Sequence, residues 1–167
     1  MAVVARRDPD EVLTALEASG KYEQLLETLS RRDRERAVTL ADELRRDYPS
    51  SPFADQADLA VASSWVSAPD LPKAAERLKS VADGSRDPEL KLVARLRLAR
   101  VQIAQSKPDE ALKTLGAVEA GAFAPRFEAV RGDAYLAKGD RKAALESYRK
   151  ARAAEAAGVV DGEILDL

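Results

Sequence analysis

The chain contains no cysteine and no histidine, and only 5% of its residues are aromatic. Without thiolate or imidazole, the common zinc sites and any catalytic triad with a histidine base are excluded. The 27 lysines and arginines nearly balance the 29 acidic residues, and the two signs are mixed along the chain. Nucleic-acid binding is therefore disfavoured, because it needs a basic face and often stacking aromatic side chains.

Long apolar runs are also missing from the sequence. Runs such as Met1 to Ala5 fall far short of the ~18 to 20 residues that cross a bilayer. We therefore expect no membrane-spanning segment within this chain. With 167 residues, of which 46% are hydrophobic, the chain has room for one compact core or one short repeat array.

Helix signals run through the whole sequence. An oxygen-bearing cap residue precedes proline at Pro9, Pro52 and Pro88, which is typical of helix starts. Apolar residues recur at helical period, and no segment alternates convincingly as a strand. The predicted helices cover about residues 9–30, 33–47, 52–67, 70–83, 87–105, 108–118, 123–138 and 140–155. The fold class is therefore predicted to be all-α.

The segment 132–151 contains a pattern of small and aromatic residues. Gly132 and Tyr135 on one predicted helix are followed by Ala144 and Tyr148 on the next. This order resembles the tetratricopeptide repeat. Small residues let two helix backbones approach where they cross, and aromatic rings fill the space beside the crossing. The segment is therefore predicted to be a helical hairpin.

Weaker copies of this pattern lie upstream. The second-helix alanines are Ala37, Ala74, Ala111 and Ala144, at intervals of 37, 37 and 33 residues, close to the ~34-residue tetratricopeptide unit. We expect a tetratricopeptide-repeat-like right-handed superhelix of about four helical hairpins. An irregular helical bundle with alanines aligned by chance is the alternative, and the helix number and intervals favour the repeats.

Four segments carry a more specific resemblance. They are YPSSPFADQADLAVA from residue 48, DLPKAAERLKSVAD from residue 70, DPELKLVARLRLARVQIAQSKPDEALKTL from residue 87 and RGDAYLAKGDRKAALESY from residue 131. Over about residues 19–167 the chain resembles the periplasmic part of the YfgM-type ancillary subunits of the bacterial Sec translocon. Members of that family are held in the inner membrane by one N-terminal helix, contact the Sec channel and are implicated with periplasmic chaperones in handling emerging secretory proteins.

The resemblance implies a non-catalytic protein-binding module at the periplasmic face of the bacterial inner membrane, without a cofactor. The implied partners are the SecYEG translocon, periplasmic chaperones and unfolded secretory proteins. Residues 1–18 are expected to be a helical extension or linker from the missing anchor, 19–158 the repeat domain and 159–167 a truncated C-terminal capping segment. A generic tetratricopeptide adaptor or self-associating scaffold is the alternative, because an uncapped array end also permits a homo-oligomer.

The first helix of each stacked hairpin should line a concave protein-binding surface. The repeat register places ten residues on it: Leu59, Ser63, Val66, Leu96, Arg100, Ile103, Arg126, Ala129, Asp133 and Leu136. The surface lacks the clustered cations that would grip a terminal carboxylate, and its apolar positions suit unfolded segments or a partner's helix. In the alternative interpretation, Leu59 and Ile103 only pack against neighbouring helices.

Other candidate sites have simpler structural explanations. Trp65 is predicted to be a wedge inside a hairpin rather than a binding hot spot, and Phe123 and Phe127 a hydrophobic staple rather than a partner anchor. The S-x-x-K match at 147–150 lacks the companion motifs of a serine enzyme. The acidic turn at 83–87 is too short for calcium and contains a cation. We therefore expect neither catalysis nor a metal site.

Overall fold

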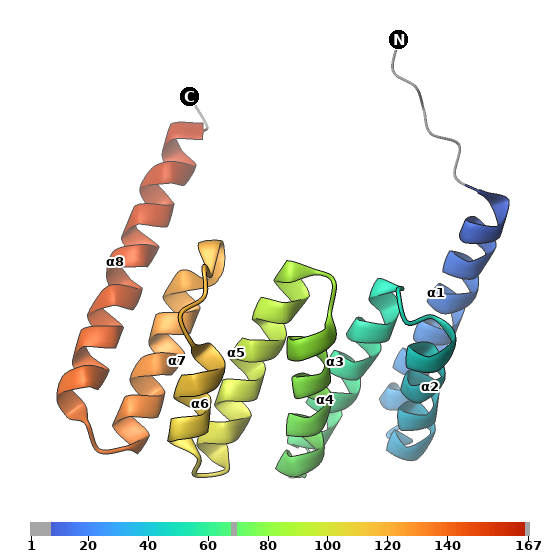
Figure 1. Ribbon diagram of the computed structural model, residues 1–167, viewed down its shortest axis with the longest axis horizontal. Coiled ribbons are helices and arrows are strands. Elements are labelled where there is room, and N and C mark those ends of the chain that lie inside the picture. Colours follow the sequence, from blue (N-terminus) through green and yellow to red (C-terminus); the bar gives the residue numbers. More distant parts are fainter. Residues whose placement is uncertain (1–7, 68–69, 166–167) are drawn as a thin grey trace.

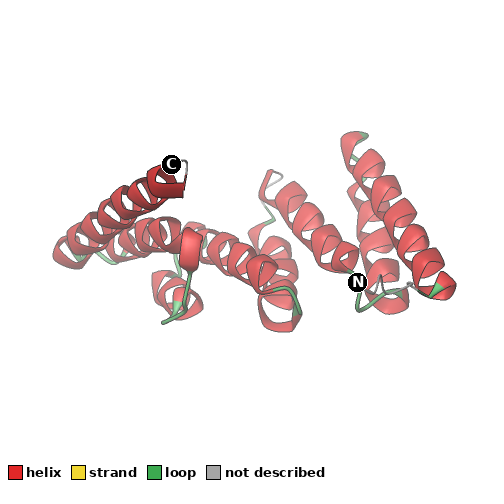
Figure 2. Ribbon diagram, turned by 90° about the horizontal axis from the view of Figure 1, so that it is seen from above, coloured by secondary structure: helices red, strands yellow, loops and turns green. Residues whose placement is uncertain are grey.

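The computed structural model describes residues 8–67 and 70–165, and over these ranges the regular structure is entirely helical (Figures 1 and 2). The helices are α1 (Pro9–Ser30), α2 (Arg34–Asp47), α3 (Pro52–Ser67), α4 (Leu71–Gly84), α5 (Pro88–Ala104), α6 (Pro108–Leu115), the short 3-10 helix η1 (Gly121–Phe123), α7 (Ala124–Ala137) and α8 (Arg141–Leu165). The predicted all-α class is confirmed.

Consecutive helices pair into four hairpins that follow one another in a row (Figure 1). Within the row, α1 contacts α3, α3 contacts α5 and α5 contacts α7, so these four helices form an inner layer. Helices α2, α4 and α6 connect successive members of this layer and form the outer layer, and α8 closes the row against α7. This arrangement confirms the predicted tetratricopeptide-like superhelix.

The turn inside the hairpins repeats one backbone conformation. Arg32, Ser106 and Gly139 have positive φ angles of 63°, 61° and 83°, and each lies five residues before the alanine of its second helix. A left-handed conformation suits glycine and costs other residues about 1 kcal/mol. Of these three residues only Gly139 is a glycine. The sequence therefore predicted this turn in the last hairpin alone.

In three of the four hairpins, the residue just before the second helix caps that helix. The carboxylates of Asp33, Asp70 and Asp140 accept hydrogen bonds of 3.1, 3.3 and 3.0 Å from the backbone N–H three residues later. Each bond satisfies a donor that the helix itself leaves unpaired. Lys107 occupies this position in the third hairpin and makes no side-chain cap bond.

The hydrophobic core is divided among the junctions between hairpins. Three clusters of buried side chains lie between α1 and α3, between α3 and α5, and between α5 and α7. Ala37, Ala74 and Ala111 are completely buried within them. Trp65 packs against both the first and the second cluster, so it contributes to the packing between hairpins, but it is half-buried and not the buried wedge that was predicted. Phe127 is buried in the third cluster, and Phe123 packs against it.

The last hairpin shows the predicted contact of a small and an aromatic residue. A Cβ atom added to Gly132 on α7 would lie 2.5 Å from Cε1 of Tyr148 on α8. The Tyr148 hydroxyl donates a 2.7 Å hydrogen bond to the Asp133 carboxylate. Burial and this carboxylate raise the pKa of Tyr148 to about 12. The ring therefore stays neutral at physiological pH and fills the space that glycine leaves.

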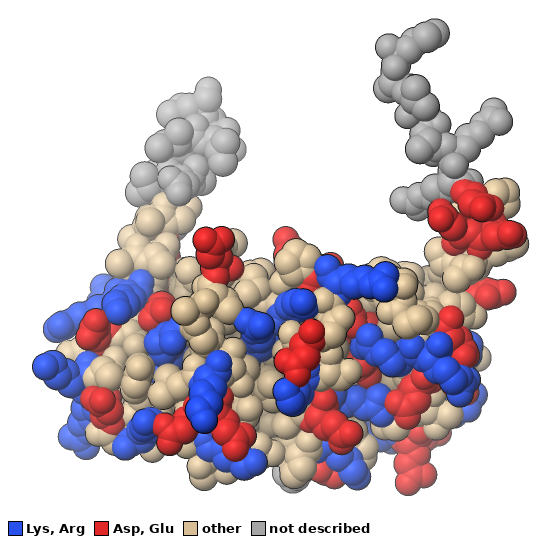
Figure 3. Space-filling view, viewed as in Figure 1, with Lys and Arg blue, Asp and Glu red and all other residues tan. Residues whose placement is uncertain are grey.

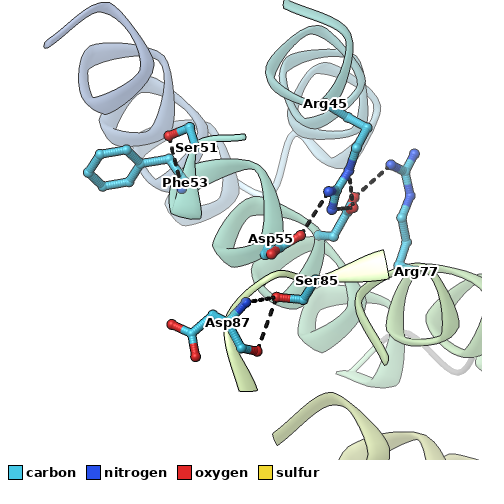
Figure 4. A network of polar contacts seen from close by, with 8 residues as sticks. Arg45, Ser51, Phe53, Asp55, Arg77, Ser85 and Asp87 are labelled. Carbon is cyan, nitrogen blue, oxygen red and sulfur yellow. Dashed lines mark hydrogen bonds and ion pairs between the residues drawn. The ribbon is translucent and has the colours of Figure 1, made fainter. Parts of the chain in front are cut away.

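A buried aspartate joins the first two hairpins. Asp58 on α3 is 2% exposed and accepts hydrogen bonds from Arg45 on α2, at 2.5 Å, and from Arg77 on α4, at 2.9 Å. Arg45 also forms a 2.8 Å ion pair with Asp55 (Figure 4). Burial disfavours the charged form of Arg45, but Asp58 and Asp55 outweigh it and raise its pKa. This network fixes α3 between α2 and α4.

Two predicted helix ends are wrong. Helix α6 was expected to reach residue 118 but ends at Leu115, because Gly116 takes φ 48° and ψ −165°. The last helix was expected to end near residue 155 and continues to Leu165. Its alanine- and glutamate-rich sequence has high helix propensity, so Gly158 and Gly162 do not stop it. Residues 1–7 and 166–167 of the predicted terminal segments lie outside the described residues.

We expect Lys107→Asp to raise the free energy of unfolding by about 1 kcal/mol, because it restores the cap that the other hairpins have. Urea unfolding measures the change. Lys113→Asp makes the same charge change in the last turn of α6, where a cation favours the helix, and should be neutral or slightly destabilising. Equal effects of the two substitutions would contradict the role assigned to the cap.

Gly132→Ala should lower the midpoint of urea unfolding. The methyl group would push against the Tyr148 ring, and such overpacking costs about 1 to 3 kcal/mol, against a gain of about 1 kcal/mol in helix propensity. Gly20→Ala on α1 is the matched control, since nothing lies within 4 Å of its added Cβ. It should raise the midpoint, and a rise in both variants would disprove the tight crossing.

Asp58→Asn should lower the free energy of unfolding by about 2 kcal/mol, because two half-buried guanidinium groups lose the charged acceptor that they share. The control is Asp42→Asn, whose side chain is 59% exposed and pairs with Arg77 alone. An exposed pair of this kind contributes less than about 1 kcal/mol. Similar losses in both variants would show that Asp58 does not hold the hairpins together.

Candidate functional site

The structure separates the ten predicted surface residues into buried and accessible positions. Leu59 and Leu96 are each 6% exposed and belong to the second and third core clusters. Ile103 is half-buried and packs against the third cluster. The predicted exposure of Leu59 and Leu96 is therefore wrong, because the close approach of successive hairpins encloses them. For Leu59 the packing alternative holds.

The other predicted residues remain accessible at the surface. Six are exposed and one, Ala129, is half-buried; the exposed ones are Ser63, Val66, Arg100, Arg126, Asp133 and Leu136. The structure brings Ser63, Val66 and Arg100 together around one hollow. The four residues on α7 do not line this hollow, so the predicted set does not form one continuous site.

This hollow, the α3–α5 groove, has a volume of about 350 Å³. Its floor consists of Ala62, Leu78 and Val101, all at most 5% exposed. Its rim consists of Ser63 and Val66 from α3 and of Arg97 and Arg100 from α5. The apolar floor and charged rim together can accommodate an amphipathic segment of another protein.

The groove lies where the inner layer is most open. Helices α3 and α5 contact each other less extensively than α1 and α3 or α5 and α7 do. Leu78 from α4 closes the space beneath them, and Val66 stands at the edge with 48% of its surface exposed. The fold thus leaves an aliphatic side chain at an accessible edge above an apolar floor.

Arg97 was missed by the sequence analysis. The repeat register places Arg100 on the inner surface, and Arg97 lies three residues earlier, a spacing that puts both side chains on one helix face. Within the described part of the chain, neither guanidinium forms an ion pair or hydrogen bond. The rim is therefore cationic and uncompensated, and the i, i+3 spacing was the sequence signal for it.

The described residues include few groups that are placed for catalysis or for binding a metal ion. Ser147 of the S-x-x-K match is 4% exposed, and Lys150 instead pairs with Glu146 at 3.1 Å. Among the residues of known placement, no group of three or more acidic side chains could hold a metal ion. No helix in the same ranges is long and apolar enough to span a bilayer.

A second hollow, of about 1070 Å³, lies between the first half of α1 and the α2–α3 connection. Its lining includes the exposed side chains of Val12 and Leu16, together with Phe53, Asp10 and Asp47. Acidic side chains gather over the projecting part of α1 (Figure 3). Residues 1–18 were predicted to be a helical extension or linker, and no hollow was predicted beside them.

Comparison with known proteins places this architecture in a family. The family model described as a tetratricopeptide repeat-like domain matches residues 11–167. An ancillary SecYEG translocon subunit of Escherichia coli K12 is 38% identical over 92 residues, which cover 55% of this chain and 45% of that protein. Its counterpart in Aggregatibacter actinomycetemcomitans is 32% identical over 150 residues, covering 90% of this chain and 72% of that protein.

A third relative has the same name as these two. The ancillary SecYEG translocon subunit of Neisseria gonorrhoeae is 33% identical over 108 residues, covering 65% of this chain and 52% of that protein. The chain thus spans about half the length of the Escherichia coli and Neisseria relatives. Since the similarity covers nearly the whole repeat array, the chain belongs to the family of ancillary SecYEG translocon subunits and carries its tetratricopeptide-like domain.

Proposed function

We propose that this chain is the non-catalytic protein-binding part of an ancillary subunit of the Sec translocon, and that its α3–α5 groove contacts a partner. The observation that carries the proposal is an accessible groove with an apolar floor, beside the exposed Val66. Grooves of this kind bind peptide segments or helices of other proteins. The names of the relatives support the SecYEG translocon as the assembly in which the groove acts.

The proposal includes a location and further partners. The domain would stand on the periplasmic side of the inner membrane, attached through an anchor outside this chain, and link the channel to periplasmic chaperones and emerging secretory proteins. Residues 1–18 would connect the anchor to the repeat domain of 19–158, and 159–167 would cap its far end. The first half of α1 projects beyond the neighbouring helices α2 and α3, which supports such a connection (Figure 1).

A self-associating adaptor is the second candidate function. Apolar side chains are exposed at both ends of the array, with Leu13 58% and Leu16 63% exposed on α1 and Leu145 50% exposed on α8. Unpaired ends of this kind in a repeat array can bind each other. Sedimentation of the chain over a range of concentrations would show association if this function applies, and Leu145→Asp should then weaken it.

A photo-crosslinking residue in place of Val66 should capture a translocon subunit or a periplasmic chaperone when the full-length protein is in its own membranes. The same residue in place of Lys113, which is exposed on outer-layer helix α6, is the matched control. We expect at least about tenfold less product from the control position, because crosslinking requires the partner to lie against the groove.

Two results would contradict the proposed function. Equal products from the two positions would show that the partner does not use the groove. Capture of cytosolic proteins alone, with no translocon subunit or periplasmic chaperone, would favour a generic adaptor.

A further inference from the structure

The two arginines on the rim of the α3–α5 groove differ from three of the cations on helices α2 and α4. On α2 and α4, Arg45, Arg77 and Lys79 are each paired with an aspartate at 2.9 Å or less. Arg97 and Arg100 have no such carboxylate in the described part of the chain. The groove therefore presents positive charge that a ligand can neutralise.

The two acidic residues of the neighbouring inner helix α7 do not line the groove. Glu128 forms an ion pair with Arg131, and Asp133 accepts the hydrogen bond of the Tyr148 hydroxyl. Arg126, on the same helix, adds a further exposed cation to the inner layer. The predicted inner surface is thus biased towards positive charge, although the whole chain has a net charge of −2.

The groove also separates its apolar and charged parts. Ala62, Leu78 and Val101 form the floor, whereas Arg97 and Arg100 stand on the α5 side of the rim. A volume of about 350 Å³ accommodates aliphatic side chains rather than a folded element. A segment that buries an aliphatic side chain there brings its neighbouring residues close to the two guanidinium groups.

We propose that the α3–α5 groove selects protein segments in which an aliphatic side chain is adjacent to side-chain carboxylates. This inference rests on the proposed function and specifies the ligand of the same groove. The aliphatic group gains from leaving water, and the carboxylates form charge-assisted hydrogen bonds with Arg97 and Arg100. Neutral apolar segments gain only the first of these contributions, so charge decides the preference.

Two synthetic peptides with blocked ends test the inference. One has leucines followed by aspartates, and the other has asparagines in place of the aspartates. Blocked ends exclude binding through a terminal carboxylate. Fluorescence anisotropy with the repeat array should give about tenfold tighter binding of the aspartate peptide at low salt, a factor that corresponds to two charge-assisted contacts partly exposed to solvent. Added salt should reduce this preference.

The double variant Arg97→Gln and Arg100→Gln should bind both peptides equally and keep the affinity of the asparagine peptide. Arg149→Gln with Arg152→Gln makes the same charge change at exposed positions of α8 and should keep the preference. Circular dichroism and urea unfolding of each variant show whether the array remains folded.

The outcomes separate this inference from the proposed function. Equal binding of both peptides to the unchanged protein, or an equal loss of preference in both double variants, would overturn the charge selection and leave the groove as a binding site. Binding of neither peptide would also overturn the inference. Crosslinking at Val66 decides the proposed function independently of the peptides.

Discussion

The close crossing of paired helices is the constraint on which the rest of the structure depends. Ala37, Ala74 and Ala111 are completely buried at these crossings, and Gly132 leaves room for the Tyr148 ring. Because each hairpin packs mainly on its neighbours, the apolar core is divided among the junctions and the molecule extends as a row. A row exposes more surface than a compact bundle of equal length, and this surface is what a binding module requires.

The groove follows from local differences in that packing. Asp58 ties α3 to α2 and α4, whereas α3 and α5 approach each other less extensively than the other inner pairs. The space between them keeps an apolar floor and a rim with two arginines that have no ion-pair partner among the described residues. The ion pairs of Asp58 thus hold α3 in place between α2 and α4, and a small gap in the inner layer provides the place for a partner.

Local signals in the sequence predicted the helices and their order. Asp–Pro and Ser–Pro pairs indicate helix starts, and the spacing of Gly132, Tyr135 and Tyr148 indicates a helical hairpin. Both signals depend on residues that are near one another in the sequence. Burial and ion pairs that depend on distances between hairpins were not predicted. It placed Leu59 and Leu96 on the surface because the register defines a helix face but not how deeply the next hairpin covers it. The pairing of Asp58 with Arg45 and Arg77 likewise joins three helices, so no short stretch of the sequence predicts it.

We propose that partners bind in the α3–α5 groove and not at the ends of the array. Methyl NMR spectra of the repeat array, recorded with and without the partner captured from membranes, distinguish these two modes of binding. We expect the resonances of Val66, Leu78 and Val101 to shift on binding while that of Leu145 on α8 stays unchanged. Shifts confined to Leu13, Leu16 and Leu145, with the groove resonances unmoved, would contradict it.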